Sequence, residues 1–426
     1  MKRFTNQALA ICLSCIGVSA AGCSMSGGIP GSGEPVTEKG EAITAAGATA
    51  PAPVPQEITI VSTPHAKCTL RASSATTSPQ SAPVWADDVG LVHLWAPPAS
   101  VSEMYSLDCS AGGDTAQHSF DLANAATFLP AAAPAAAVGR KTRPALTNPT
   151  TLTQAELFAA GYPPRPDPTL APSLYGKWLK IVSIATTLIP PHLVERSDLH
   201  FGAATNKTST RWTGIALNTP ATRYIVVAGA FGVPTGFLPP GGAASSNVAT
   251  WVGLDGWSNA DVVQDGVDYA TTGTVGSYSA WYEYYPSAPV FNTSMVVHPD
   301  DTMQFWSWEC DSTGVHGAGH TGYGCFWYQN ETTNVSAGGF IVRAPNGLFQ
   351  GLTAEGVIER QPGIPLSLFS QSDVEFDATD TSGATHNVNS DAYLNITLIN
   401  NSGATMAHTN YYISPDVILF TWNRSL

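Results

Sequence analysis

The chain has 426 residues, of which 43% are hydrophobic and only 12% are charged, about half the charged share of an ordinary globular protein. From residue 201 onward it carries 18 acidic and 6 basic residues, against 14 and 12 before that point. Nucleic acids and anionic membranes attract cationic patches, so the acidic C-terminal half argues against both as partners. Acid would protonate many of these carboxylates and weaken their mutual repulsion, so the composition suits an acidic medium.

The N-terminus has the pattern of an export signal. Lys2 and Arg3 provide the positive start, and residues 8–20 form an apolar run too short to span a bilayer. Residues 18–20 fit an ordinary signal peptidase, whereas residues 20–23 resemble a bacterial lipobox that would place a lipid on Cys23. We therefore expect residues 1–22 to be a signal peptide and the protein to be secreted, or lipid-anchored at the cell envelope through Cys23.

Three segments are predicted between the signal and residue 200. Residues 23–56 are rich in Gly, Ala, Pro and Ser and indicate a flexible linker. Residues 57–125 contain short β-like runs and indicate a small β module or a propeptide. Residues 126–200 are rich in Pro and Ala, with a short helix expected near Thr153–Ala160, and indicate a linker and a propeptide-like segment. A propeptide would be removed near residue 200 in acid.

The pattern changes at about residue 201. Short runs of alternating apolar and polar residues are separated by Gly, Pro and Asn, which is typical of an antiparallel sandwich or barrel. The expected strands are Arg223–Ala230, Ala249–Leu254, Ala260–Tyr269, Ser277–Tyr285, Met303–Glu309, Cys325–Gln329, Glu355–Arg360, Ser372–Ala378, Tyr393–Ile399 and Val417–Trp422.

Four cysteines remain after the signal and Cys23, and they allow three pairings. Export permits disulfides. The local pairs Cys68–Cys109 and Cys310–Cys325 each close a loop within one segment and are favoured. The second loop contains an H-x3-H run at residues 316–320, but its Gly and Ala neighbours favour a plain disulfide-closed loop over a zinc site.

Strand alternation predicts a polar face across three of the expected strands. Unpaired carboxylates are costly in a dry core, so this face is either solvated or a groove, and its tryptophans favour the groove. Such a groove suits an enzyme, and it equally suits a protein that binds peptides or glycans. The shared faces hold Gln264, Gly266 and Asp268; Ser279, Trp281 and Glu283; and Glu355, Val357 and Glu359.

Four motifs, in this order and spacing, resemble the glutamic peptidases, the eqolisin family (peptidase family G1, formerly A4). They are residues 251–256 (WVGLDG), 263–269 (VQDGVDY), 278–286 (YSAWYEYYP) and 354–360 (AEGVIER), and the Trp212-Thr213-Gly214 run resembles the strand that opens that domain. The resemblance covers about residues 205–426. It implies an all-β fold, a sandwich of two bent antiparallel sheets of concanavalin A-like or jelly-roll type, preceded here by the small β-rich N-terminal region.

The resemblance also implies a catalytic pair, Gln264 and Glu355, in a pepstatin-insensitive acid endopeptidase that cleaves proteins or peptides, with no metal or cofactor and as a monomer. The alternative is a catalytically weak or inactive binder of peptides or glycans. The chain departs from the family pattern at Gly356 and Ser279, where the family has Trp and Asp, and both changes are expected to alter groove shape or the proton network. The implied substrate-binding positions are Trp251, Asp255, Asp268, Trp281, Tyr282, Glu283 and Glu359.

Overall fold

The structure is a computed structural model that describes residues 56–72, 83–96, 103–122, 139–199, 207–239, 244–257, 259–317, 319, 322–345, 349–370, 372–412 and 417–425. All of them lie in one compact unit, Pro53–Leu426. The signal at residues 1–22, Cys23, the linker up to residue 55 and His320 fall outside the described residues. No helix within these ranges is long and apolar enough to cross a membrane.

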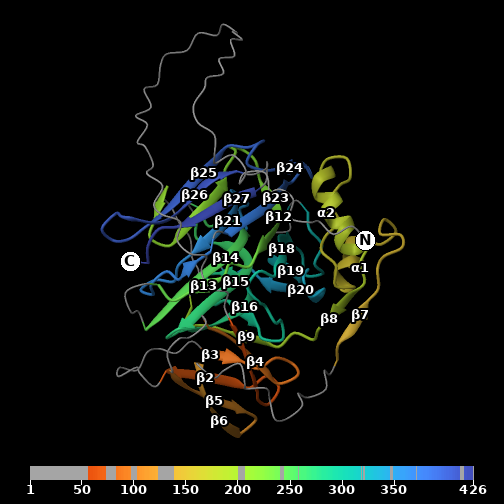
Figure 1. Ribbon diagram of the computed structural model, residues 1–426. Helices are drawn as coiled ribbons and strands as arrows, with labels where there is room; N and C mark the ends of the chain where they lie inside the picture. The colour runs from red at the N-terminus through yellow and green to blue at the C-terminus, as the bar shows by residue number, and fades with distance from the viewer. Residues whose placement is uncertain are drawn as a thin grey trace, which may run out of the picture. The chain divides into compact units, whose positions relative to one another are not determined.

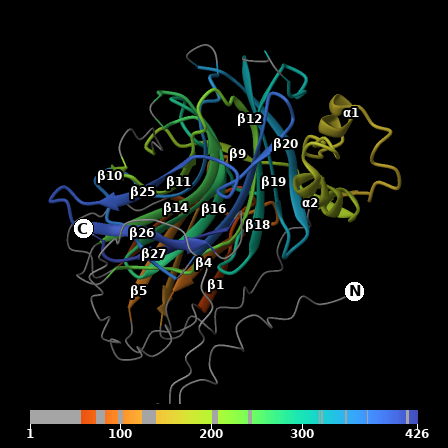
Figure 2. The ribbon, with the colours of Figure 1, turned by 90° about the horizontal axis from the view of Figure 1, so that it is seen from above.

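Two antiparallel sheets form the sandwich that the sequence predicts, and Figure 2 shows their long strands curving past one another. The first sheet carries the polar face. Its strands, in spatial order, are β9 (Leu193–Glu195), β17 (Val290–Asn292), β16 (Val275–Tyr285), β15 (Val262–Thr272), β14 (Ser245–Leu254), β21 (Ala354–Glu359), β11 (Trp212–Leu217) and β25 (Tyr393–Ile399).

The second sheet shares β25 with the first. In spatial order it contains β7 (Lys141–Arg143), β8 (Thr186–Leu188), β20 (Val335–Arg343), β19 (Tyr323–Asn330), β18 (Thr302–Cys310), β12 (Tyr224–Gly232), β23 (Ser372–Asp380), β27 (Val417–Trp422), β26 (Thr405–Tyr412) and β25. Short strands β10 (Thr208–Ser209) and β24 (Thr385–His386) extend its edges, and β13 (Gly236–Phe237) pairs with β22 (Leu368–Phe369).

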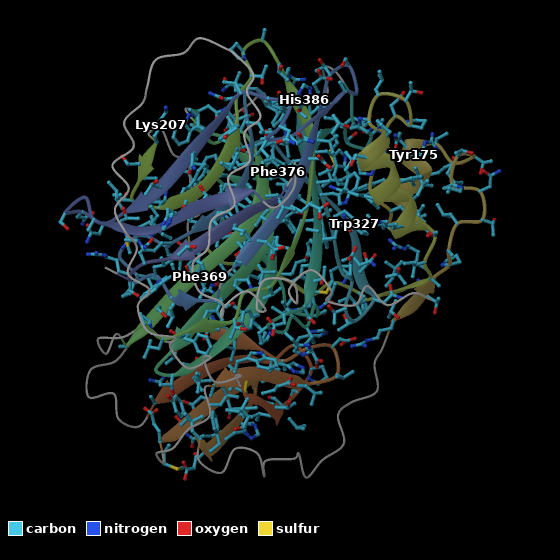
Figure 3. The ribbon with its side chains drawn as sticks, turned by 45° about the horizontal axis from the view of Figure 1, so that its top comes forward. Tyr175, Lys207, Trp327, Phe369, Phe376 and His386 are labelled. Atoms are coloured by element: carbon cyan, nitrogen blue, oxygen red, sulfur yellow. A yellow bond between two sulfur atoms is a disulfide. The ribbon has the colours of Figure 1, made fainter. Side chains whose placement is uncertain are left out.

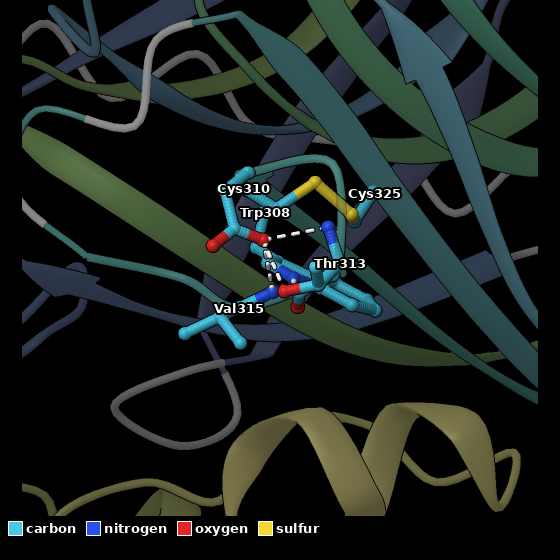
Figure 4. The surroundings of a disulfide bond; sticks show 7 residues. Trp308, Cys310, Thr313, Val315 and Cys325 are labelled. Atoms are coloured by element: carbon cyan, nitrogen blue, oxygen red, sulfur yellow. Dashed lines mark hydrogen bonds between the residues drawn. A yellow bond between two sulfur atoms is a disulfide. The ribbon is translucent and has the colours of Figure 1, made fainter.

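The facing surfaces of the sheets are packed with aromatic rings. Tyr282 of the first sheet stacks on Phe326 and Phe340 of the second, with ring centroids 5.0 and 4.8 Å apart. Burial of such large apolar side chains is the main stabilising term of a sandwich. The disulfide Cys310–Cys325 closes the β18–β19 hairpin, as predicted. Figure 4 shows its loop, in which the Trp308 indole donates to the Gly314 carbonyl.

The predicted N-terminal β module has its own four-stranded sheet, in the order β3 (Pro83–Trp85), β2 (Lys67–Ala72), β5 (Met104–Ala111) and β6 (Asp114–Asp121). The predicted Cys68–Cys109 disulfide joins β2 to β5. A separate antiparallel pair, β1 (Gln56–Val61) with β4 (Leu91–Ala96), connects to the sandwich, because Trp95 pairs with Gly276 of β16. Figure 1 shows the module below the first sheet of the sandwich.

Residues 139–199 pack on the sandwich. Helix α1 (Gln154–Ala159) lies where the sequence predicts it, with a Thr153–Glu156 capping box. Helix α2 (Pro172–Val182) is not among the sequence predictions. Both helices lie beside β18–β20 in Figure 1, and Trp178 is buried against that sheet. Trp327 of β19, labelled in Figure 3, donates its indole N–H to the Gly161 carbonyl at 2.8 Å.

Arg143 ties this segment to the second sheet. It is 2% exposed, and its guanidinium donates to the Gly161 carbonyl, Thr186 Oγ1 and Gln329 Oε1. Its carbon Cζ lies 4.3 Å from the centre of the Tyr162 ring. Burial without a carboxylate partner lowers its pKa to about 10. The arginine therefore replaces its hydration with three acceptors and an aromatic face.

Arg143→Met should lower the free energy of unfolding by about 2–4 kcal/mol, because it leaves buried acceptors without a donor. Arg71→Met, which removes an exposed ion pair with Asp108, should change it by less than about 0.5 kcal/mol. Urea unfolding followed by circular dichroism measures both values. Equal losses in the two variants would show that Arg143 does not hold the segment in place.

Candidate active site

The two residues predicted as a catalytic pair flank a single glycine. Gly253 of β14 lies directly opposite Gln264 of β15 on one side and Glu355 of β21 on the other. Ala216 pairs with Glu355, and Glu283 pairs with Gln264, so five residues form one row across the sheet. Paired residues point to the same face of the sheet. Two strand spacings separate the backbones of Gln264 and Glu355, which is roughly 10 Å across the sheet. We call this surface the site face.

Two further rows complete the site face. In the next row, Trp251 pairs with Gly266 and Val357, and Gly266 pairs with Trp281. The following row carries the acids Glu359 and Asp268, which flank Ala249. The sequence prediction that the polar faces of these strands coincide is therefore confirmed by the register.

Gly253 lies between the pair and has no side chain of its own. A Cβ atom at this position would lie 3.0 Å from the Gln264 Cβ and 3.0 Å from a ring carbon of Trp251. These separations are tighter than ordinary van der Waals contact, so a larger residue would displace one of its neighbours. The position therefore requires a glycine, because Gln264 and the Trp251 ring already occupy the space beside it.

Glu355 is fully buried, and neither of its oxygens makes a hydrogen bond of good geometry with a described residue. Burial raises the pKa of Glu355 well above its usual range, and the Asp255 carboxylate adds to this. Thr353 and the Trp257 backbone act in the opposite direction. A buried carboxyl that is weakly hydrogen-bonded and has a perturbed pKa is typical of a functional group rather than of a structural one.

Gln264 is held in place by the next residue of its row. Its amide Nε2 donates to Glu283 Oε2, which leaves one N–H of the same nitrogen for another acceptor. Gln264 Oε1 has no hydrogen-bond partner among the described residues. Burial raises the pKa of Glu283 well above its usual range, and the nearby Glu359 carboxylate adds to this effect. Glu283 thus orients the amide of Gln264.

The acids of the outer row are also anchored. The Trp251 indole donates to Glu359 Oε2 at 3.1 Å, and the Asn247 amide donates to Asp268 Oδ1. Burial raises the pKa of Asp268 to about 6, opposed by Asn247 and Arg196. Asn247 is missing from the sequence predictions, although it shares strand parity with Trp251. That parity is the signal that could have identified it.

Asp255 has a different environment from the rest of the predicted set. It lies just beyond the end of β14, and its carboxylate accepts the backbone N–H groups of Gln350, Gly351 and Leu352 at 2.7–3.0 Å. Its φ of 66° places it in the left-handed region. Asp255 therefore fixes the loop that leads into β21 and the Glu355 backbone.

Two residues expected to shape the groove face away from it. Tyr282 lies between the sheets, because it alternates with Trp281 and Glu283, so its prediction as a substrate-binding residue is wrong. Gly356 also faces the interior, where an added Cβ would lie 2.9 Å from Phe376, which is labelled in Figure 3. Phe376 thus occupies the space beside Gly356, while Ser279 does lie on the site face, opposite Asp268.

The site face is covered. Gln264, Glu283 and Glu355 are each at most 1% exposed. One described part of the cover is residues 196–199, which follow β9. Leu199 packs with Trp281 and Phe291, and the Arg196 guanidinium lies 5.4 Å from the Phe291 ring. A cavity of about 420 Å³ lies elsewhere, between residues 164–168 and strands β12 and β18.

The Asp268 carboxyl makes stability depend on pH. Its pKa is near 6 in the folded protein and near 3.8 when unperturbed, so the folded state binds its proton more tightly. This contribution is fully present below about pH 4 and is lost as pH rises through about 6. Asp268→Asn, whose oxygen still accepts from Asn247, should therefore raise unfolding free energy near pH 7 by about 3 kcal/mol and leave it little changed near pH 4.

Urea unfolding at the two pH values measures this effect, and Asp114→Asn at the exposed start of β6 is the control. A gain for Asp268→Asn that is the same at both pH values would contradict the assignment.

Comparisons with known proteins place the sandwich in a family. Residues 210–419 match the model of the Peptidase A4 family. Among solved structures, Scytalido-glutamic peptidase with a peptide based transition state analog is 19% identical with a TM-score of 0.40, and the match covers 50% of this chain and 99% of that one. A search of the curated proteins found no match.

Two further solved structures are similar. SCP-B, a member of the Eqolisin family of peptidases in a complex with the tripeptide Ala-Ile-His, is 19% identical with a TM-score of 0.38 over 50% of this chain and 99% of that one. Aspergilloglutamic peptidase from Aspergillus niger is 22% identical with a TM-score of 0.33 over 42% and 99%. The resemblance predicted from the sequence is thus confirmed by the family model, since residues 210–419 of this chain match the Peptidase A4 family.

Proposed function

We propose that this protein is an endopeptidase that works in acid, with Glu355 as general base and acid and Gln264 as the donor to the oxyanion. The observation that carries the proposal is the row Gln264–Gly253–Glu355. It presents a carboxyl and an amide on either side of a residue that has no side chain. Hydrolysis of a peptide bond needs a proton acceptor for the attacking water and a hydrogen-bond donor for the carbonyl oxygen, and the row supplies both.

The proposed reaction has two steps. Glu355 as carboxylate takes a proton from water, and the water oxygen attacks the carbonyl carbon while the electrons of the C=O bond move to its oxygen. The free N–H of Gln264 donates to that oxygen. The C–N bond then breaks, its electrons pass to nitrogen, and protonated Glu355 gives its proton to the leaving amine. The products are a carboxylic acid and an amine, and Glu355 is regenerated as carboxylate.

The covered site suits a latent form. With its pKa raised by burial, Glu355 is neutral in acid and cannot act as a base. Contact with water would lower this pKa towards the usual carboxyl range, so uncovering the site face would activate the base. We propose that residues upstream of about 200 include a propeptide and that acid trimming near residue 200 exposes the site. The charge pattern and the export signal support a protein that is secreted or tethered through Cys23.

Two substitutions test the proposal. After acid incubation, the wild-type protein should cleave casein between about pH 2 and 5 in the presence of pepstatin. Glu355→Gln should lower kcat/KM by about 10³-fold or more and Gln264→Ala by about 10²–10³-fold, because they remove the proton carrier and an oxyanion donor. Glu331→Gln and Gln117→Ala, both exposed, are the matched controls and should keep wild-type activity.

Circular dichroism establishes that each variant is folded. A folded, acid-trimmed wild-type protein without activity at any pH would contradict the enzyme proposal and favour a protein that binds peptides or glycans. Activity that survives in Glu355→Gln would place the chemistry on another residue.

A further inference from the structure

A cluster of ligand-type side chains lies where the N-terminal module meets the sandwich. Glu57 belongs to β1, His93 to β4, and His298 to the loop between β17 and β18. Glu57 Oε1 lies 2.7 Å from His93 Nδ1 and 3.6 Å from His298 Nε2. Among the described residues, this is the one group of three or more His, Cys, Asp or Glu whose ligand atoms all lie within 4.8 Å of one another.

We propose that Glu57, His93 and His298 bind a divalent cation of the zinc class, which links the N-terminal module to the sandwich. Zinc takes imidazole nitrogen and carboxylate oxygen at about 2.0–2.2 Å, so tetrahedral ligand atoms lie roughly 3.3 Å from each other. The spacing of 2.7 and 3.6 Å needs only small side-chain movements to reach that geometry. The fourth position is left for water.

The far nitrogen of each imidazole faces a carboxylate, which is the outer arrangement that zinc-binding histidines use. His93 Nε2 lies 3.6 Å from Asp87 Oδ2, and His298 Nδ1 lies 3.6 Å from Asp301 Oδ2. The other nitrogens, Nδ1 of His93 and Nε2 of His298, lie at 2.7 and 3.6 Å from the shared Glu57 oxygen.

The two outer carboxylates are themselves fixed. Asp87 accepts hydrogen bonds from the backbone N–H groups of Val89 and Leu91. Asp301 accepts them from the side-chain amide of Asn330 and from the backbone N–H of His298. Both acids are at most 5% exposed. The anchored carboxylates are therefore in place to accept from the imidazoles once the rings shift to bind a cation.

The charge of the cluster also favours a cation. Three carboxylates, Glu57, Asp87 and Asp301, surround two imidazoles. Arg140, the nearby cation, is already bound by Asp88 with a 2.6 Å contact. The Glu57 side chain is 36% exposed and that of His298 is 29% exposed, so an ion can enter from solvent. None of the three ligands lies on the site face, so this inference does not depend on the proposed peptidase activity.

Isothermal titration of the intact chain with Zn²⁺ alone, near pH 8, tests the proposal. We expect one-to-one binding that weakens by about 100-fold or more in His93→Ala and in His298→Ala, because each loses a ligand. Asp301→Asn should weaken it by about 10–100-fold. His298→Cys should retain binding, since a thiolate replaces the imidazole as ligand. Zn²⁺ should raise the Tm of the wild type and not that of His298→Ala.

Two controls locate the site. His408→Ala changes a histidine outside the cluster, and His65→Ala changes the second pair of close histidines, in which His65 stacks on His192 with ring centroids 4.3 Å apart. Neither should alter Zn²⁺ binding. If a histidine variant fails to fold, Glu57→Gln replaces it and should weaken binding by about 10-fold or more. Absence of saturable binding to the wild type, or binding lost in His65→Ala and kept in His93→Ala and His298→Ala, would overturn the proposal.

Discussion

The antiparallel pairing of β14 with β15 on one side and β21 on the other decides which side chains share the site face. Residues that lie directly opposite each other on neighbouring strands point to the same face of the sheet. Because Gly253 lies on the site face, Gln264 and Glu355 must lie on that face beside it. A slip of one residue in either pairing would turn the side chains of the slipped strand into the core between the sheets. The register thus places the pair, and the glycine between them allows Gln264 and the Trp251 ring to lie close beside it.

The same register concentrates carboxyl groups on a buried surface, and this has an electrostatic consequence. Glu355, Glu283 and Asp268 all have raised pKa values, chiefly because burial disfavours their charged forms. Each holds its proton more tightly in the folded than in the unfolded chain, so together they favour the folded state in acid and oppose it near neutrality. This bias agrees with the expectation, drawn from the acidic composition of the C-terminal half, that the chain suits an acidic medium.

Local patterns in the sequence predict most strands, because alternation and turn residues act over a few positions. They place Glu355 and Glu359 on one face, and Gln264 and Asp268 on another. They cannot show that Gly253 joins these faces, since that depends on pairing β14 with β21 about a hundred residues further along the chain. Helix α2 was not predicted because the Pro-rich segment before it obscured the spacing of its buried residues Leu174, Trp178 and Ile181. The Tyr282 prediction failed because a motif position was carried over against strand parity. The Glu57–His93–His298 cluster likewise comes from three distant segments.

The central claim is that Gln264 and Glu355 act together on one peptide bond. It is tested most directly by a crystal structure of the acid-trimmed protein with a peptide analogue of the tetrahedral intermediate. The account predicts that the tetrahedral centre lies above Gly253, with one oxygen accepting from the Gln264 amide and another hydrogen-bonded to the Glu355 carboxyl. An analogue that binds elsewhere, or that contacts only one of the two side chains, would contradict it.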